Sequence, residues 1–240
     1  MSRLADGEGL LFLHGAGGTP LVWQPQLLAF PRARAPELPG RAGRAPEGVD
    51  GYLEALRAAL PPAARVVAGH SLGGAIALRW ALRFPREVRG LIVVGASGRM
   101  RVTPAWLDGI ARGDPGAVEA FGACWFGPAA DPRLREKSLA LLRATPRDVL
   151  LADLRAADTF DVRGELDRVR APALVVAGAE DRLVPVDRAR ALADALPGAE
   201  LVVVEHAGHM VMLERPCETT AVIRAWLARF EALHAGEAGA

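Results

Sequence analysis

The chain has 240 residues, of which 51% are hydrophobic and 24% charged, and 29 basic against 28 acidic side chains give a net charge of +1. This composition is typical of a globular protein with a substantial core. Basic residues are interspersed with acidic ones, and no apolar run approaches the roughly 20 residues that cross a bilayer, so we expect neither a nucleic-acid partner nor a membrane segment. The first residues lack the basic and apolar regions of a secretion signal, which predicts a cytoplasmic protein.

The two cysteines, Cys124 and Cys217, are too few and too far apart in the sequence for a metal cluster. Free cysteines are usually buried, so we expect two reduced thiols inside the protein. No other motif requires a metal ion or an organic cofactor, and we expect none.

Apolar runs and helical spacing alternate along the first part of the chain. Residues 10–13, LLFL, are too few for a helix and predict a buried parallel strand that ends at the glycine-rich segment 14–18. Residues 30–47 are rich in Pro, Gly and Arg and predict a long loop, in which only residues 33–38 could form a strand. Apolar residues recur at helical spacing over 49–60, where we expect a surface helix.

The next segments predict a βαβ unit and then a change of pattern. Residues 65–69 and 91–94 resemble strands and flank a helical stretch at 72–84, which is the arrangement of a parallel sheet. Between 99 and 166 no β-branched run occurs, and we predict an all-helical insertion. Its helices are expected at 105–112, 115–126, 134–144 and 147–157. After it, strands are expected at 173–177 and 201–204, and helices at 188–195 and 220–230.

The turn between the second strand and its helix reads Gly69-His70-Ser71-Leu72-Gly73. A G-x-S-x-G pattern directly after a strand and before a helix is typical of a nucleophile elbow, in which glycines permit a strained turn that exposes the serine hydroxyl. Ser71 is therefore the candidate nucleophile, and we expect His70 to point away from it and support the elbow. The alternative is that Ser71 only caps the helix, but a cap does not need glycine on both sides.

A serine nucleophile needs a histidine base, and the base needs a carboxylate that fixes its tautomer. Asp181 and His209 each follow a predicted strand, so both are expected at the carboxyl ends of strands, in the order serine, acid, histidine. We assign Asp181 as the orienting acid and His209 as the general base. Glu180 is the alternative acid, and His206 is expected to be structural. A capping role for Asp181 at the next helix is the non-catalytic alternative.

The tetrahedral intermediate of acyl transfer needs hydrogen-bond donors for its oxyanion. Small residues in the segment 14–18, HGAGG, let backbone N–H groups approach closely, and the helix after Ser71 points its N-terminus at the same place. We predict that the N–H groups of Ala16 and Leu72 form the oxyanion hole. The glycines fit neither of the two common nucleotide-binding patterns, which argues against a phosphate cradle.

Five blocks together resemble the α/β-hydrolase superfamily, in particular its compact capped serine esterases and related hydrolases. They read HGAGG, APELPG, GHSLGG, GAEDRLVP and GHMVMLERP, at residues 14–18, 35–40, 69–74, 178–185 and 208–216. The resemblance covers residues 10–98 and 167–230. It implies an α/β fold with a mostly parallel sheet flanked by helices. It also implies a core made of residues 1–98 and 167–240 and a helical cap at 99–166 above the substrate pocket.

Two departures from this pattern matter. Glu37 replaces the usual aspartate, and Arg41-Ala42 stand where His-Gly is common. Only nine residues precede the first predicted strand, so the N-terminal edge of the sheet is shortened relative to the family. An edge that is less covered than usual can pair with another chain, and a homodimer through it is one expectation.

The leading functional hypothesis is hydrolysis of a small, apolar carboxylic ester through an acyl-enzyme. Aromatic residues of the expected cap predict an apolar pocket, and the candidate substrate contacts are Trp106, Phe121, Trp125 and Phe126. The same triad would also serve a C–C bond hydrolase or a thioesterase. A third hypothesis, from a different class, is a ligand-binding signalling protein that retains the triad and turns over slowly.

Overall fold

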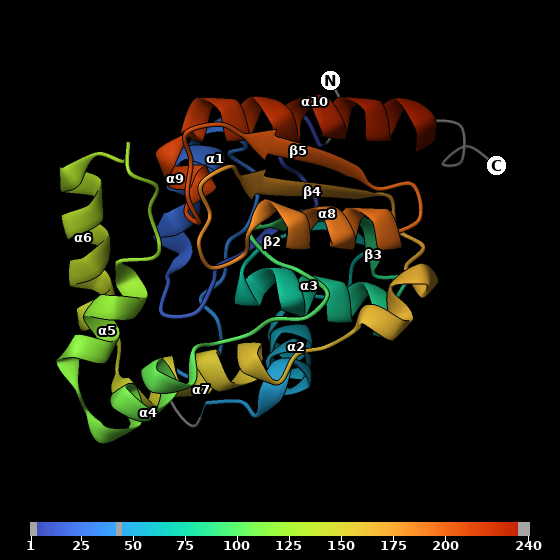
Figure 1. Ribbon diagram of the computed structural model, residues 1–240. Coiled ribbons are helices and arrows are strands. Elements are labelled where there is room, and N and C mark those ends of the chain that lie inside the picture. The colour runs from blue at the N-terminus through green and yellow to red at the C-terminus, as the bar shows by residue number, and fades with distance from the viewer. Residues whose placement is uncertain (1–3, 42–44, 235–240) are drawn as a thin grey trace.

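The structure is a computed structural model that describes residues 4–41 and 45–234. Its centre is a five-stranded sheet in which every strand runs parallel to its neighbours, in the order β1-β2-β3-β4-β5 (Figure 1). Each pair of parallel strands needs a crossover connection, as the alternation in the sequence predicts. The strands are β1 Leu10–Leu13, β2 Arg65–His70, β3 Val88–Val94, β4 Ala173–Gly178 and β5 Glu200–Val204.

Helices cover both faces of this sheet. α10 (Pro216–His234) packs with α1 (Gln24–Ala29) on one face, while α2 (Gly48–Ala59), α3 (Leu72–Arg83) and α8 (Val186–Ala195) cover the other (Figure 1). Because both faces are covered, the inner strands can be apolar throughout, and every residue of β2 and β4 is buried. The edge strand β5 is half-buried over most of its length.

The helix that follows β2 lies deep in the molecule. α3 buries nine residues against the sheet and against α2, including Trp80, whose side chain is inaccessible to solvent. Its sequence, LGGAIALRWALR, accordingly consists of glycine and apolar residues at all but its two arginine positions. The N-terminus of α3, and with it the position of Ser71, is therefore fixed by the core of the fold.

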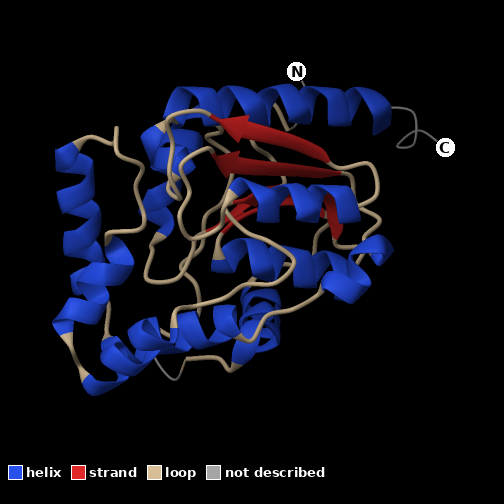
Figure 2. Ribbon diagram, viewed as in Figure 1, coloured by secondary structure: helices blue, strands red, loops and turns tan. Residues whose placement is uncertain are grey.

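Four helices follow one another between β3 and β4, and we refer to them together as the cap; Figure 2 shows them as helices joined by loops, without strands. We predicted that the second of these helices would extend to residue 126, but this helix, α5, ends at Gly122. The chain turns after Gly122, and the Trp125 carbonyl accepts the Met210 N–H of the core at 3.0 Å. The cap helices are α4 Pro104–Arg112, α5 Pro115–Gly122, α6 Pro132–Arg143 and α7 Arg147–Asp158.

The two connections between the cap and the sheet run side by side. Arg99 pairs with Asp161 in an isolated antiparallel bridge, and the N–H of Val162 donates to Gly98 O at 2.8 Å. The short helix η2 (Arg163–Arg168) then leads into β4. The two ends of the cap segment are therefore hydrogen-bonded to each other.

Residues 33–38, which we considered as a strand, form none. Only Arg34 pairs with β1: its carbonyl accepts the N–H of Phe12 at 2.8 Å, and its N–H donates to Leu10 O at 3.0 Å. Pro36 has no N–H, so the ladder cannot continue. These two bonds occupy the outer edge of β1, the edge that the short N-terminal segment was expected to leave less covered.

Four short elements escaped prediction because they are too short to show a period: η1 (Pro20–Trp23), α1, η2 and α9 (Val211–Glu214). α1 has only six residues, and the proline at its second position resembles a helix breaker although it suits the first turn. No helix within the described ranges is long and apolar enough to cross a membrane.

Both cysteines are free, but the expectation that they are buried is wrong. Cys217 is exposed and Cys124 is half-buried. Cys217 lies in the first turn of α10, whose inward face is formed instead by Thr219 and Ile223, both inaccessible to solvent. One helical turn separates those two positions, and Cys217 falls outside their stripe.

Candidate active site

The turn between β2 and α3 holds a strained serine. Ser71 has φ +53° and ψ −117°, a conformation that residues other than glycine rarely adopt and that costs on the order of 1–3 kcal/mol. Its N–H donates to Val94 O at 2.9 Å, which anchors the turn to β3. Strain at the carboxyl end of a strand, directly before a helix, is the geometry of a nucleophile elbow.

Close backbone contacts explain the glycines of this turn. A Cβ on Gly69 would lie 2.1 Å from Gly73 O, and a Cβ on Gly73 would lie 2.4 Å from Leu13 O. No side chain fits at these distances, so only glycine lets α3 approach β1 and β2 so closely.

Asp181 and His209 form a buried pair. His209 Nδ1 lies 2.8 Å from Asp181 Oδ2, and the two side chains are 3% and 0% exposed. The other carboxylate oxygen accepts the N–H groups of Leu183 at 2.8 Å and Val184 at 2.9 Å. Because Asp181 acts as acceptor in all three contacts, His209 donates from Nδ1, which leaves the lone pair of Nε2 free to take a proton.

His70 supports the backbone beside this pair. Its Nε2 donates to His209 O at 3.0 Å, and the two imidazole rings lie 4.6 Å apart. Complete burial lowers the pKa of His70 well below its ordinary value, so the ring is neutral at physiological pH. His70 Nδ1 has no hydrogen-bond partner within the described residues. The ring therefore acts as a neutral donor to the loop that carries His209.

Glu214 ties the same loop to the cap. Its Oε1 accepts the Gly208 N–H at 2.9 Å, and its Oε2 accepts the Gly127 N–H at 2.8 Å. Burial raises the pKa of Glu214, although the backbone N–H groups favour the ionised form. Together with the bond from Met210 to Trp125, these contacts fix the loop before and after the histidine.

The alternative acid and the second histidine lie apart from this pair. Glu180 is one-third exposed, and its nearest imidazole is that of His206, 3.9 Å away. His206 itself is 71% exposed and has a positive φ of 54°. Neither residue contacts the buried pair of Asp181 and His209 through its side chain.

A small cavity of about 10 Å³ has both Ser71 and His209 in its wall, while Asp181 lies outside the wall. Two larger surface hollows, of about 470 and 450 Å³, include none of these residues in their walls. Within residues 4–41 and 45–234, no group of three His, Cys, Asp or Glu side chains is arranged to hold a metal ion. The small cavity is lined by Gly15, Ala16, Gly18, Val22, His70, Ser71, Phe121, Trp125, His209 and Met210.

Of the four aromatic residues predicted to contact substrate, Phe121 and Trp125 line this cavity. Their rings meet edge to face with centroids 5.6 Å apart. Trp106 is not among the lining residues and lies behind Phe121, with ring centroids 5.7 Å apart. Phe126 is buried and does not line the cavity either. Its backbone, with that of Gly127, passes close to Gly208. The two lining rings are therefore the better candidates for substrate contact.

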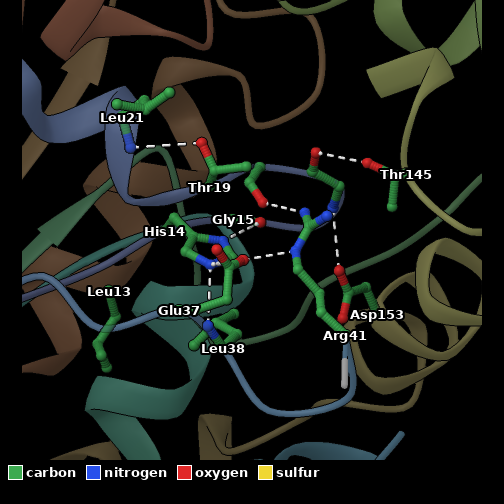
Figure 3. Close-up of polar contacts among 12 residues, drawn as sticks. Leu13, His14, Gly15, Thr19, Leu21, Glu37, Leu38, Arg41, Thr145 and Asp153 are labelled. Atoms are coloured by element: carbon green, nitrogen blue, oxygen red, sulfur yellow. Dashed lines mark hydrogen bonds and ion pairs between the residues drawn. The ribbon is translucent and has the colours of Figure 1, made fainter. Parts of the chain in front are cut away.

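The glycine-rich loop at residues 14–18 is held by its own backbone. Gly15 O accepts a hydrogen bond from His14 Nδ1 at 2.9 Å (Figure 3). The same oxygen accepts the Gly18 N–H at 3.1 Å. A trans peptide points its N–H opposite to its carbonyl, so the Ala16 N–H faces away from those two donors. Within the described residues neither that N–H nor the one of Leu72 has an acceptor, which is rare for buried backbone.

Polar residues around this loop escaped prediction. Glu37 contacts both His14 Nε2, at 3.2 Å, and Arg41 Nε, at 2.5 Å, and Arg41 also donates to Gly18 O (Figure 3). Burial raises the pKa of Glu37, but the contacts with His14 and Arg41 outweigh burial and lower it. From the other side, the cap residue Asp153 accepts the N–H of Gly17.

Comparison with known proteins supports the interpretation of this geometry. Residues 10–222 match the model of the alpha/beta hydrolase family. The chain belongs to that family. It is 34% identical to a pimeloyl-[acyl-carrier protein] methyl ester esterase of Aromatoleum aromaticum, with 89% of this chain and 96% of the relative aligned. A relative from Variovorax paradoxus, 32% identical over 85% of this chain and 86% of its own length, carries the name of a carbamate hydrolase.

Solved structures agree with the sequence relatives. A thermophilic esterase superposes with a TM-score of 0.80 and 31% identity, covering 92% of this chain and 90% of its own. A hydrolase from Pseudomonas aeruginosa superposes with a TM-score of 0.81 and 27% identity, covering 91% of this chain and 89% of its own. The family and these relatives identify the chain as a hydrolase of the esterase type.

Proposed function

We propose that the chain is a serine hydrolase that cleaves small carboxylic esters through an acyl-enzyme, with Ser71, His209 and Asp181 as its catalytic triad. The observation that carries this proposal is the buried contact of 2.8 Å between His209 and Asp181, beside a cavity that His209 shares with the strained Ser71. A buried, oriented imidazole that shares a cavity with a serine is the arrangement that activates such a nucleophile.

The reaction begins when Ser71 Oγ attacks the ester carbonyl and His209 Nε2 takes the hydroxyl proton. Asp181 stabilises the imidazolium through the Nδ1–H bond, and the N–H groups of Ala16 and Leu72 stabilise the oxyanion. Collapse of the intermediate breaks the bond to the alcohol, which leaves with the proton from His209. Water, deprotonated by His209, then attacks the acyl-enzyme, and Ser71 recovers its proton as the acid departs.

The walls of the cavity support an apolar acyl group as the substrate portion nearest the serine. Val22, Phe121, Trp125 and Met210 contribute apolar side chains there. The two relatives are named as a methyl ester esterase and a carbamate hydrolase, names that suit substrates with a small leaving group. We infer an ester with a short alcohol portion and an apolar acyl portion.

The test is hydrolysis of p-nitrophenyl esters of increasing acyl length by the wild-type protein, Ser71→Ala and His209→Ala. The wild type should show saturable hydrolysis with a burst of p-nitrophenol when deacylation is slow. Each variant should lose about three orders of magnitude in kcat, since the triad acts as one unit. Hydrolysis by Ser71→Ala at the wild-type rate would refute the assignment of the nucleophile.

A further inference from the structure

A carboxylate of the cap is buried against the glycine-rich loop. Asp153, on α7, is 2% exposed, and no ion pair joins it to a basic side chain in residues 4–41 or 45–234. Burial raises its pKa above the ordinary value, because the charge loses its hydration. A buried carboxylate of this kind destabilises the fold unless hydrogen bonds compensate, so its presence calls for an explanation.

Both oxygens of Asp153 have defined partners. Oδ1 accepts the hydroxyl of Tyr52, on α2, at 2.5 Å. Oδ2 accepts the N–H of Gly17 at 3.0 Å, a contact drawn from Asp153 in Figure 3. The tyrosine therefore fixes the carboxylate from the core side, and the carboxylate fixes the loop. Bonds from a donor to a carboxylate are stronger than those between neutral groups, which suits a long-range anchor between cap and core.

The cap holds Gly17 from a second side as well. The hydroxyl of Thr145, in the turn between α6 and α7, donates to Gly17 O at 3.2 Å (Figure 3). Gly17 has φ +65°, and a Cβ there would lie 2.6 Å from Leu142 Cδ1 and 3.0 Å from Leu150 Cδ1. The cap thus binds both polar backbone groups of this glycine and packs against its α-carbon.

These bonds constrain the backbone on both sides of Ala16 and so limit how far its N–H can turn. The peptide before Ala16 is fixed through Gly15 O, which the core holds, and the peptide after it is fixed through the Gly17 N–H, which Asp153 holds. When two successive peptide planes are fixed, the φ and ψ angles of the residue between them are fixed too. The core supplies the constraint on the peptide before Ala16, and the cap supplies the constraint on the peptide after it.

We propose that Asp153 is a positioning residue for the oxyanion hole: it reaches from the cap to the Gly17 N–H and so aims the Ala16 N–H at the reacting carbonyl. This inference rests on the proposed function, because it assumes that Ala16 donates to the oxyanion. It implies that the oxyanion hole is fully formed only while the cap is docked on the loop. Asp153 does not touch the reacting atoms itself.

The first test separates kcat from KM. Asp153→Ala removes the acceptor and should lower kcat for p-nitrophenyl butyrate by about tenfold, a fraction of the 10²–10³ lost when an oxyanion donor is removed outright. KM should change less than kcat. Asp153→Asn keeps an oxygen for the Gly17 N–H and should retain most of the wild-type kcat. Asp148→Asn is the matched control and should behave as wild type, because Asp148 is exposed in the first turn of the same helix and its side chain makes no hydrogen bond or ion pair within the described residues.

The second test does not depend on hydrolysis. In ¹⁵N-labelled protein the Gly17 amide should be protected from exchange in the wild type and in Asp153→Asn, and should lose protection in Asp153→Ala while the amides of β2 keep theirs. If Asp153→Ala fails to fold, Thr145→Val, which removes the donor to Gly17 O, should lower kcat in the same direction.

The outcomes distinguish the two proposals. A wild type that hydrolyses no ester refutes the proposed function, whereas the Gly17 amide still decides whether Asp153 holds the loop. Unchanged kcat in Asp153→Ala, or unchanged protection of Gly17, overturns the positioning role. An equal loss of kcat in Asp153→Asn and Asp153→Ala also overturns it, because the remaining acceptor should have rescued the loop.

Discussion

Replacing Asp181 by asparagine tests the proposed triad most sharply, because the structure determines which way the new amide must face. In the wild type, Oδ1 accepts two backbone N–H groups, from Leu183 and Val184, and Oδ2 faces His209. In Asp181→Asn the amide oxygen must stay with the two N–H donors, since turning the side chain over would set an NH₂ group against them. The NH₂ group therefore faces His209 Nδ1.

This orientation reverses the tautomer of His209. Its Nδ1 must then accept a hydrogen bond, so the ring proton moves to Nε2, which can no longer take the proton of Ser71. We expect kcat to fall about 10⁴-fold, equivalent to about 5 kcal/mol of transition-state stabilisation. The fold should persist, because every hydrogen bond around the side chain is still made.

The assay is steady-state hydrolysis of p-nitrophenyl butyrate, with circular dichroism to confirm that the variant is folded. Glu180→Gln is the matched control, since Glu180 is the neighbouring carboxylate and its side chain lies near His206 instead. It should keep the wild-type kcat. A folded Asp181→Asn variant with more than about a tenth of the wild-type kcat would refute the tautomer argument, and a large loss in Glu180→Gln would transfer the acid role to that residue.

Three further predictions follow from the site. A fluorophosphonate probe should label the wild type covalently and leave Ser71→Ala unlabelled; intact-protein mass spectrometry that finds the adduct on the variant would place the nucleophile elsewhere. Trp125→Ala should alter hydrolysis of long acyl esters more than that of acetate, whereas Trp106→Ala, one ring further from the cavity, should not; equal effects on all esters would assign Trp125 to the cap core. Because burial raises the pKa of Asp153, the folded state binds a proton more tightly than the unfolded chain, and stability falls as pH rises from its ordinary pKa toward the raised one. Asp153→Asn lacks this loss, so its Tm relative to wild type should improve as the pH rises above the ordinary value of 3.8, and a constant difference would contradict the raised pKa.

Local sequence signals were sufficient for much of the fold and for the elbow. The apolar runs of the five strands could be recognised because buried parallel strands are apolar throughout, and the glycines beside Ser71 mark a turn that no other residue can make. Asp181 and His209 could be placed at the sheet's carboxyl edge because each directly follows such a run. Short helices such as α1 could not be predicted in this way, because they contain too few residues to show a periodic spacing of apolar side chains.

The polar network of the cap could not be predicted in this way, because its partners are far apart in the sequence. Asp153 is 136 residues from Gly17 and 101 residues from Tyr52. The one local indication is a carboxylate on the buried face of α7, where Leu150 and Leu154 occupy neighbouring positions at helical spacing. A polar residue on an apolar stripe signals a buried partner, but it does not reveal which one.

Because the cavity beside Ser71 is so small, a change that tightens ester binding is expected to lower kcat. About 10 Å³ accommodates roughly one water molecule. If an ester enters only when the cap moves away from Ser71, the open state of the protein is the state that binds it. The apparent Kd then equals the intrinsic value divided by the fraction in that state, and an open fraction of about 1% weakens binding about a hundredfold. Trimming Leu142 or Leu150 would enlarge the open fraction and tighten apparent binding, yet it would also loosen the surface that keeps Asp153 on Gly17. Directed evolution that selects variants of this chain for low KM alone should therefore accumulate cap substitutions that reduce kcat.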